Sequence, residues 1–443
     1  MSFLRTVYYY YSLRKNLNYP RKKILELREK KFRKILKYAY RKIPFYKDFY
    51  GSYGIKENML DEIPIHELPT TNKNRIIDNF NKFFKDNQIT KSKVENFLKN
   101  NPNPTSLFLN KYHVIHSSGT TGTVGYYLYS KREWDFIKAI STRMFSNFTL
   151  KRKKYAFIGA VDGHYAAISL FLSPLNQPEK FFYKDYMVMD INKPIKTYLK
   201  KLNDFQPDNL TGYPFGIRSL AQFQNEGLLN IHPEVIVCGG EPLLKNVRLF
   251  LKEVWKDAEI VDSYATSESL AMGVSREDLK GMYIYDDAVY LEIKEDRTIL
   301  TNLYNYTQPI IRYELTDILK KSKDSEGKWP FTKIKQVIGR NELIPFFINE
   351  NGEKDFIHPI VIAEFFVKGV TKFQFVQKNH SSFVFKIVVS QKERSDKILE
   401  EVRNKLTNIL EKKKMQNVNF DVKIVEDIKP DEKTGKYKLI LIE

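Results

Sequence analysis

Hydrophobic positions recur with the helical period over residues 21–43, with Lys and Arg on the opposite face. The apolar positions of this pattern are Leu25, Phe32, Leu36, Ala39 and Ile43. Pro44 ends the predicted helix because proline has no N–H to donate. We expect this basic amphipathic helix to cover its own domain rather than to lie on a membrane surface.

A second pattern, over residues 234–265, predicts a strand, a helix and another strand. The apolar run 234–238 is followed by Gly239-Gly240, a helical pattern over 242–255 and a run at 259–264. This order predicts two parallel strands joined by a right-handed crossover. Since ligands of such sheets bind beyond the carboxyl ends of the strands, we expect residues 239–242 and 265–268 to share one crevice.

The remaining patterns predict α/β architecture with a large first domain and a smaller second one. In the first we expect a strand at 112–115, a helix at 134–148, a strand at 155–161 and strands over 281–301. From about residue 343 the order of elements changes. The last predicted elements are strands at 373–376 and 383–389, a helix at 397–410 and a strand at 418–425.

We therefore predict a large N-terminal domain over residues 1–340, built from mixed or parallel sheets and helices, with a basic helical lead-in over 1–50. Residues 341–443 are predicted to form a small, mobile α+β domain.

The chain contains 73 Lys and Arg and 53 Asp and Glu, so its net charge is +20. Such an excess raises the question whether the protein binds an anionic partner. The excess is heaviest in 14–56 and 151–154 and forms no single basic tail. We interpret it as a solvated face without specific nucleic-acid binding, with weak contact to a membrane surface as a further option. A non-enzymatic polyanion-binding protein remains an alternative.

Other features restrict the compartment and the chemistry. We find no signal-peptide pattern and no apolar run of about 18 residues that would span a membrane. The single cysteine, Cys238, excludes an internal disulfide and a Cys-rich zinc site, and its apolar neighbours predict a buried thiol. His113 and His116 lie three apart on a predicted strand, so their side chains point to opposite faces and do not predict a metal site. We expect a cytoplasmic protein.

The stretch most suggestive of chemistry is HSSGTTGTVGYY, residues 116–127. Glycines allow backbone N–H groups to approach an anion closely, and the hydroxyls add donors. Neither GxxxxGK[ST] nor GxGxxG fits it. We also expect the helix at 134–148, just past this loop, to favour an anion with its N-terminal N–H groups.

This loop resembles the phosphate-binding loop [ST]SG[ST]TGxPK of the adenylate-forming enzymes, with Val124 and Gly125 in place of Pro and Lys. Three later stretches follow in the family's order: SYATSE at 263–268 is similar to YGxTE, RYELTD at 312–317 to RYRTGD, and PDEKTGKYK at 430–438 to PKTxSGKxxR. GRNE at 339–342 resembles the domain hinge GRxD.

Within this superfamily the chain is most similar to the phenylacetate-CoA ligase branch and the related capsular-polysaccharide (CapK-type) proteins. The stretches that carry this similarity are IPFY at 43–46, TGYP at 211–214, GGEPL at 239–243 and PIIRY at 309–313.

The resemblance implies an enzyme that activates a carboxylic acid with ATP and Mg²⁺ as an acyl-adenylate. The acyl group would then pass to CoA, or to an amine or sugar of a polysaccharide. An adenylyltransferase that leaves AMP on its acceptor, as with deazaflavin coenzymes, is the alternative. Relatives often pair, so we expect a homodimer.

The resemblance also implies roles for particular residues. Phosphates would be held by Ser117, Ser118, Gly119, Thr120, Thr121 and Gly122. Glu268 would ligate Mg²⁺, and Thr266 would support the α-phosphate. The nucleotide would further contact Gly239, Gly240, Glu241, Pro242, Ser263, Tyr264, Ala265, Asp317 and Arg340.

Lys436 is the expected catalytic residue, since its ammonium can reach both the acyl carboxylate and the α-phosphate from a mobile domain. The expected substrate pocket contains Tyr213, Phe215, His164 and Tyr165. In the stretch before Asp317, Glu314 and Thr316 replace the family's Arg and Gly, and the hinge Asp is either replaced by Glu342 or displaced by one residue. These departures would either slow the domain rotation or fit a second step without CoA.

Overall fold

The computed structural model describes most of the chain. The described residues are 2–117, 124–145, 151–176, 180–181, 183–295, 297–322, 327–338, 343–363, 365, 367, 369–389, 395–429 and 438–443.

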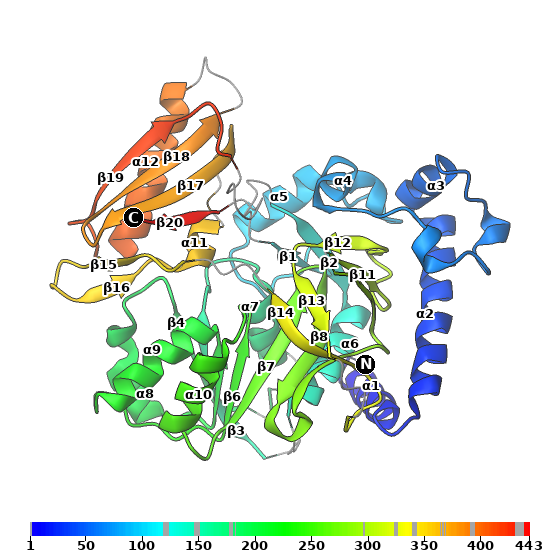
Figure 1. The fold of residues 1–443 in the computed structure, drawn as a ribbon, viewed down its shortest axis with the longest axis horizontal. Coiled ribbons are helices and arrows are strands. Elements are labelled where there is room, and N and C mark those ends of the chain that lie inside the picture. The colour runs from blue at the N-terminus through cyan, green and yellow to red at the C-terminus, as the bar shows by residue number, and fades with distance from the viewer. Residues whose placement is uncertain are drawn as a thin grey trace.

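A mixed sheet, with nine strands among the described residues, forms the centre of the protein (Figure 1). Five neighbouring strands run parallel, in the order β4 (Tyr183–Asp190), β3 (Lys153–Gly159), β5 (Asn209–Gly212), β6 (Val235–Gly239) and β7 (Glu259–Thr266). The other four are antiparallel to their neighbours: β8 (Ser269–Arg276), β9 (Gly281–Ile284), β14 (Thr332–Ile338) and β13 (Ile318–Lys321). The predicted α/β class and the parallel pair β6 and β7 are confirmed.

Helices α8 (Leu199–Phe205), α9 (Pro214–Asn225) and α10 (Lys245–Val254) lie together beside the parallel strands (Figure 1). Their apolar faces share one core with the strands, in which Ile158, Ile236 and Ile260 meet Leu220 and Leu251. Cys238 belongs to this core, and burial raises the pKa of its thiol, as expected of a structural cysteine. Helix α10 begins three residues later than predicted, because residues 240–244 form the turn that leaves β6.

One prediction around the glycine-rich loop is wrong. The loop joins β1 (Tyr112–His116) to an antiparallel partner, β2 (Tyr126–Ser130), so a strand rather than a helix follows it. Helix α6 runs over Lys131–Ser141 instead of 134–148. A capping box sets its start: Ser130 Oγ accepts from the Glu133 backbone, and Glu133 accepts from the Ser130 backbone. The cap therefore satisfies the N–H of Glu133 in the first turn of this helix.

The N-terminal helices α1 (Ser2–Asn16), α2 (Arg21–Lys42) and α3 (Pro44–Gly51) wrap the outside of the large domain (Figure 1). Helix α2 buries Phe32, Ile35 and Ala39, which confirms that it covers its own domain. Arg28 Nη1 also lies 2.9 Å from Asp286 Oδ1, in the turn between β9 and β10.

Smaller elements complete this part of the chain. The helices are α4 (Lys73–Asp78), α5 (Lys91–Asn100) and α7 (Ala166–Leu172), and a second sheet contains β10 (Val289–Ile293), β11 (Thr298–Asn302) and β12 (Tyr313–Leu315).

The C-terminal part has a sheet and a core of its own. The predicted order is confirmed by β17 (Val370–Asn379), β18 (Ser382–Val389), α12 (Ser395–Lys412) and β19 (Asn419–Ile424). The pattern missed β20 (Ile440–Ile442), the hairpin β15 (Phe346–Ile348) with β16 (Lys354–Phe356), and helix α11 (Pro359–Ala363). A boundary near residue 341 stays a prediction, because 339–342 lie outside the described residues.

The buried pair of Arg143 and Asp287 joins several of these elements. Arg143 Nη1 and Nη2 donate to Asp287 Oδ1 and Oδ2 at 2.8 and 2.7 Å, and Asn16 of α1 donates to the same carboxylate. Burial alone would raise the pKa of Asp287, but Arg143, together with Lys31 and Asn16, brings the pKa below its usual range.

Asp287→Ala is therefore expected to lower the free energy of unfolding by about 3 to 5 kcal/mol, since it leaves Arg143 buried without its partner. Denaturant unfolding monitored by circular dichroism measures the loss. Asp48→Ala, which breaks the exposed pair of Lys82 and Asp48, is the control, with an expected loss under about 1 kcal/mol. Equal losses in the two variants would contradict the assignment.

Candidate active site

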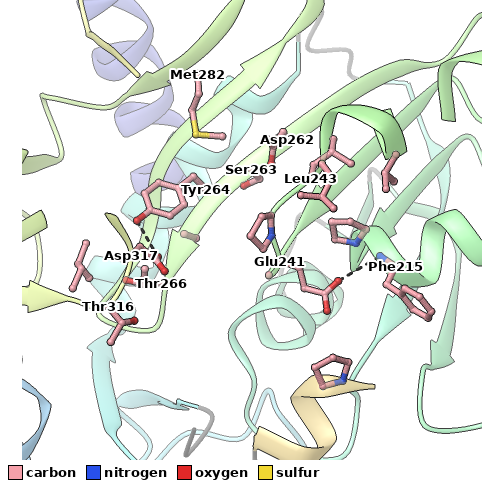
Figure 2. Close-up of a pocket in the computed structure, with 18 of the residues that line it drawn as sticks. Phe215, Glu241, Leu243, Asp262, Ser263, Tyr264, Thr266, Met282, Thr316 and Asp317 are labelled. Carbon is pink, nitrogen blue, oxygen red and sulfur yellow. Dashed lines mark hydrogen bonds between the residues drawn. The ribbon is translucent and has the colours of Figure 1, made fainter. Parts of the chain in front are cut away.

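A cleft of about 1730 Å³ opens at the carboxyl ends of β5, β6 and β7. Figure 2 shows side chains from separate segments of the chain facing it, among them Phe215, Glu241, Tyr264 and Asp317. From the N-terminal half, Asn72, Lys73, Asn74 and Ser117 also line it. From the C-terminal part, the lining residues are Leu343, Ile344, Phe346, Pro359 and Ile442.

The turn after β6 forms one wall of the cleft. Gly240 has φ of +83°, and a Cβ there would lie 2.8 Å from the Tyr213 ring, so only glycine fits this turn. Gly240, Glu241 and Pro242 line the cleft together with residues of β7, as the parallel pairing predicts. Gly239 pairs with Ser263, which holds the two loops side by side.

The opposite wall contains a tyrosine bonded to a carboxylate. Tyr264 Oη lies 3.1 Å from Asp317 Oδ2 (Figure 2). Burial, and then the Asp317 charge, raise the pKa of Tyr264 well above its usual range, so it remains a protonated donor. Residues 53 positions apart in sequence are thereby held together at the cleft.

Glu268 lies in the turn between β7 and β8 and lines the cleft, although only 9% of it is exposed. Tyr127 Oη donates to Glu268 Oε1 at 2.8 Å, and Asn302 Nδ2 donates to its backbone carbonyl at 3.1 Å. The Glu268 charge also contributes, after burial, to the raised pKa of Tyr313. Thr266, Ser263 and Ala265 line the cleft on the same strand.

Part of the glycine-rich loop is described. The Ser117 backbone donates to the Gly125 carbonyl at 2.8 Å, and the Gly125 backbone donates to Ser117 Oγ at 3.0 Å. These two bonds close the base of the loop, and Ser117 faces the cleft. Ser118, Gly119, Thr120, Thr121 and Gly122 lie outside the described residues, as do Arg340, Glu342 and Lys436.

The four predicted substrate residues are not brought together in the cleft. Phe215 lines it, whereas Tyr213, Tyr165 and His164 are not among its lining residues. Tyr213 supports the turn at Gly240 from behind. His164 is 1% exposed, and its Nε2 lies 2.7 Å from the Asn101 carbonyl, which favours a structural role.

Tyr165 and the two histidines of β1 form ring contacts. Tyr165 packs against the ring of His116 with centroids 4.4 Å apart. His113 stacks instead on Trp134 at 4.0 Å. Burial lowers the pKa of His113 to about 3 and that of His116 to about 4, so both rings are neutral near pH 7.

Two groups of cleft residues were missed by sequence reasoning. Asp262 lies one residue before the predicted motif, and Arg248 Nη2 lies 3.8 Å from its carboxylate. Its position near the end of a predicted parallel strand could have indicated that it lies at the cleft. Asn72, Lys73 and Asn74 reach the cleft because the Thr71 backbone pairs with Arg312 and Glu314. The contact joins segments about 240 residues apart in sequence, and no local sequence pattern predicts it.

Comparisons with known proteins agree with this geometry. Residues 350–443 match the family model of the CapK C-terminal domain. We refer to these residues by the name of that model, the CapK C-terminal domain. The whole chain is similar to protein CapK of Staphylococcus aureus, with 24% identity over 434 residues that cover 94% of this chain and 89% of that protein.

Solved structures show the same fold. The chain is similar to 2-hydroxyisobutyryl-CoA ligase in complex with 2-HIB-AMP and CoA, with a TM-score of 0.64, 16% identity, and coverage of 97% of this chain and 92% of that one. The same ligase in the postadenylation state matches with a TM-score of 0.57 and 15% identity, over 94% and 89% of the two chains. The resemblance that the motifs predicted is thus confirmed in sequence for protein CapK and in fold for this CoA ligase.

The CapK C-terminal domain contacts the cleft through a histidine. His358 Nε2 lies 2.5 Å from Glu241 Oε1, in the turn after β6. The His358 ring is fully buried and packs against Tyr213 and Phe215. The position of this domain is therefore tied directly to the cleft wall.

Lysines at the end of α12 add further links to the large domain. Lys412 Nζ lies 2.9 Å from Asp162 Oδ2, at the surface. Lys413 is buried, and its Nζ donates to the Lys193 carbonyl of the large domain at 3.4 Å and lies 3.5 Å from Asp355 Oδ1 of its own domain. Burial lowers the pKa of Lys413, although Asp355 opposes this effect.

The buried carboxyl group of Asp262 should make the stability of the protein depend on pH. Burial raises its pKa to about 7, against an ordinary value of 3.8, and Arg248 only partly opposes this. A carboxyl group with a raised pKa in the folded state costs stability as pH rises through the interval from about 4 to 7.

Asp262→Asn removes that ionisation. Relative to the native protein, we expect the variant to gain stability between pH 5 and pH 8, by no more than about 4 kcal/mol, from three pKa units at about 1.4 kcal/mol each. Denaturant unfolding of both proteins across this range measures the difference. A difference that does not change with pH would show that Asp262 titrates normally.

Proposed function

We propose that the chain is a ligase that activates a carboxylic acid with ATP as an acyl-adenylate and then transfers the acyl group to CoA, or to an amine or sugar. The observation that carries this proposal is the cleft, which gathers Glu268, the Tyr264 and Asp317 pair, and the turn at 240–242 from separate segments. The 2-hydroxyisobutyryl-CoA ligase of the same fold is described with an acyl-AMP and CoA bound, which supports the proposal.

The chemistry asks the protein to bring two anions together. A carboxylate oxygen attacks the α-phosphorus, the bond from that phosphorus to the bridging oxygen breaks, and pyrophosphate leaves with the electron pair. Positioning and electrostatic stabilisation account for most of the catalysis of such a transfer. Ser117, together with Ser118, Gly119, Thr120, Thr121 and Gly122, would hold the β- and γ-phosphates.

Glu268 fits a magnesium ligand by its chemistry and position. Its carboxylate supplies hard oxygen donors at the cleft, and Tyr127 fixes the orientation of one of them. No cluster of three or more His, Cys, Asp or Glu suited to a metal occurs within the described ranges, so phosphate oxygens and water would complete the coordination. Mg²⁺, when bound, would neutralise charge on the departing pyrophosphate. Thr266 would support the α-phosphate beside it.

The nucleoside would lie between the two walls of the cleft. Asp317, held by Tyr264, would accept hydrogen bonds from the ribose hydroxyls. Gly239, Gly240, Glu241 and Pro242 would form the wall against the adenine, with Tyr264 stacking on the base. Arg340 would help hold the nucleotide at the hinge.

Lys436 would act as the catalytic cation between the acyl carboxylate and the α-phosphate. A primary ammonium on a flexible stem suits a charge that must reach two anions. Ile442, six residues further on, lines the cleft, which supports a place for this end of the chain at the site. Phe215 would contact the acid, whose identity is open.

Lys436→Ala is expected to lower acid-dependent release of pyrophosphate at least about a hundredfold, because the charge that bridges both anions is lost. The assay contains ATP, Mg²⁺, hydroxylamine as a trap and a panel of carboxylic acids. Lys433→Ala, a lysine of the same stretch, is the matched control and should retain activity.

Equal activity in the two lysine variants would contradict the catalytic role of Lys436. A different result would contradict the ligase proposal itself. If no acid in the panel releases pyrophosphate from a protein shown to bind ATP, while AMP becomes attached to an acceptor, the adenylyltransferase alternative is favoured.

Asp317→Asn is expected to raise KM for ATP about tenfold or more with a smaller effect on kcat, because a ribose contact stabilises ground state and transition state alike. Tyr264→Phe, which removes only the bond to Asp317, should raise KM less. Steady-state kinetics at saturating acid measures both variants. An unchanged KM for ATP in Asp317→Asn would exclude Asp317 from the nucleotide site.

A further inference from the structure

Helix α1 presents an apolar stripe to solvent. Leu4 is 71% exposed, and Tyr8 and Tyr11 are each 68% exposed. Their spacing of four and three residues places them in one row on the helix. Lys15 continues the same row and is exposed as well.

The opposite face of α1 is held firmly on the large domain, so the stripe is a fixed feature of the surface. Arg5 Nη2 lies 2.7 Å from Asp135 Oδ2 of α6, and the Tyr9 ring packs against Phe136. Leu13 is buried, and Asn16 donates to Asp287 at 2.7 Å. A helix docked along this whole face cannot turn the stripe inward.

All charged side chains in the first 25 residues of the chain are basic. Before Glu26 the chain contains six Lys and Arg and no Asp or Glu. Arg14, Lys15, Lys22 and Lys23 are exposed where α1 meets the start of α2 (Figure 1). None of the ion pairs between described residues includes Lys15 or Lys22.

We propose that this surface, Leu4, Tyr8 and Tyr11 with Arg14, Lys15 and Lys22, docks on an anionic lipid bilayer. Tyrosine and leucine enter the region between headgroups and acyl chains, while Lys and Arg meet the negative lipid headgroups. Among the described residues no helix is long and apolar enough to cross a membrane, so the contact would be peripheral.

A lipid surface fits these observations better than other occupants do. A second copy of the chain would bring the same basic residues and a net charge of +20 against them, and like charges repel. A nucleic acid would match the charge and could stack on tyrosine, but it offers nothing apolar to Leu4.

The position of α1 leaves the rest of the molecule free on such a surface. In Figure 1 the helix and the C-terminal four-stranded sheet lie at opposite ends of the protein. Contact through α1 therefore leaves the CapK C-terminal domain away from the bilayer.

The test is sedimentation of the full chain with vesicles of phosphatidylcholine and phosphatidylglycerol, and with vesicles of phosphatidylcholine alone. We expect binding to the anionic vesicles that the triple variant Leu4→Ser/Tyr8→Ser/Tyr11→Ser weakens at least about tenfold. Lys15→Glu/Lys22→Glu should weaken it by a similar factor, and more at low salt than at high salt.

A matched control separates this stripe from exposed apolar residues in general. Tyr53, Leu228 and Leu249 are 57%, 51% and 61% exposed and lie on other elements. The triple variant Tyr53→Ser/Leu228→Ser/Leu249→Ser should bind anionic vesicles as the native chain does. Circular dichroism shows whether all variants are folded.

Several results would overturn the proposal. They are absence of vesicle binding by the native chain, equal binding to neutral vesicles, and equal binding by the α1 triple variant. Self-association or binding of single-stranded nucleic acid that depends on the stripe, without vesicle binding, would assign this surface to those partners instead.

Discussion

Parallel pairing of neighbouring strands is the constraint on which the rest of the site depends. Strands β5, β6 and β7 run in the same direction, so the segments that leave them all emerge at one edge of the sheet. Pairing of Gly239 with Ser263 fixes how the two loops lie side by side at the cleft. This pairing places two features in one cavity: the turn at Gly240, which only glycine allows, and the end of β7 beside Glu268.

Buried tyrosines hold the acidic side chains of this cavity in place. Tyr127 donates to Glu268, and Tyr264 donates to Asp317. In both pairs burial raises the pKa of the tyrosine, so it remains a donor while the carboxylate accepts. A site built in this way keeps its acceptors oriented before any ligand arrives, which is what electrostatic stabilisation of a charged transfer requires.

The contacts of the CapK C-terminal domain connect the position of that domain to the same cavity. His358 meets Glu241 in the turn after β6, and Lys413 Nζ donates to the Lys193 carbonyl of the large domain. These contacts link the domain to the turn after β6 and to the segment after β4, so its position beside the cleft is set by specific contacts. A proposed movement of the domain during the reaction would have to break the pair at Glu241, which lies on the cleft wall.

Local patterns in the sequence determined the elements and most of the chemistry. The periodicity of α2, the strand, helix and strand over 234–265, and the order of the C-terminal elements depend on neighbours within a few residues, and sequence shows these directly. Helix α6 was misplaced because β2 follows the glycine-rich loop, and a short apolar run fits either state until its pairing is known.

Tertiary structure alone decided which residues share the cleft. Asn72, Lys73 and Asn74 reach it only because Thr71 pairs beside Arg312 and Glu314, a contact across some 240 residues. His164 and Tyr213 were placed at the substrate by their neighbours in sequence, but the fold buries both, and neither lines the cleft. Sequence specifies which side chains can do chemistry, whereas burial and distance, which arise only when distant segments pack, determine which of them meet.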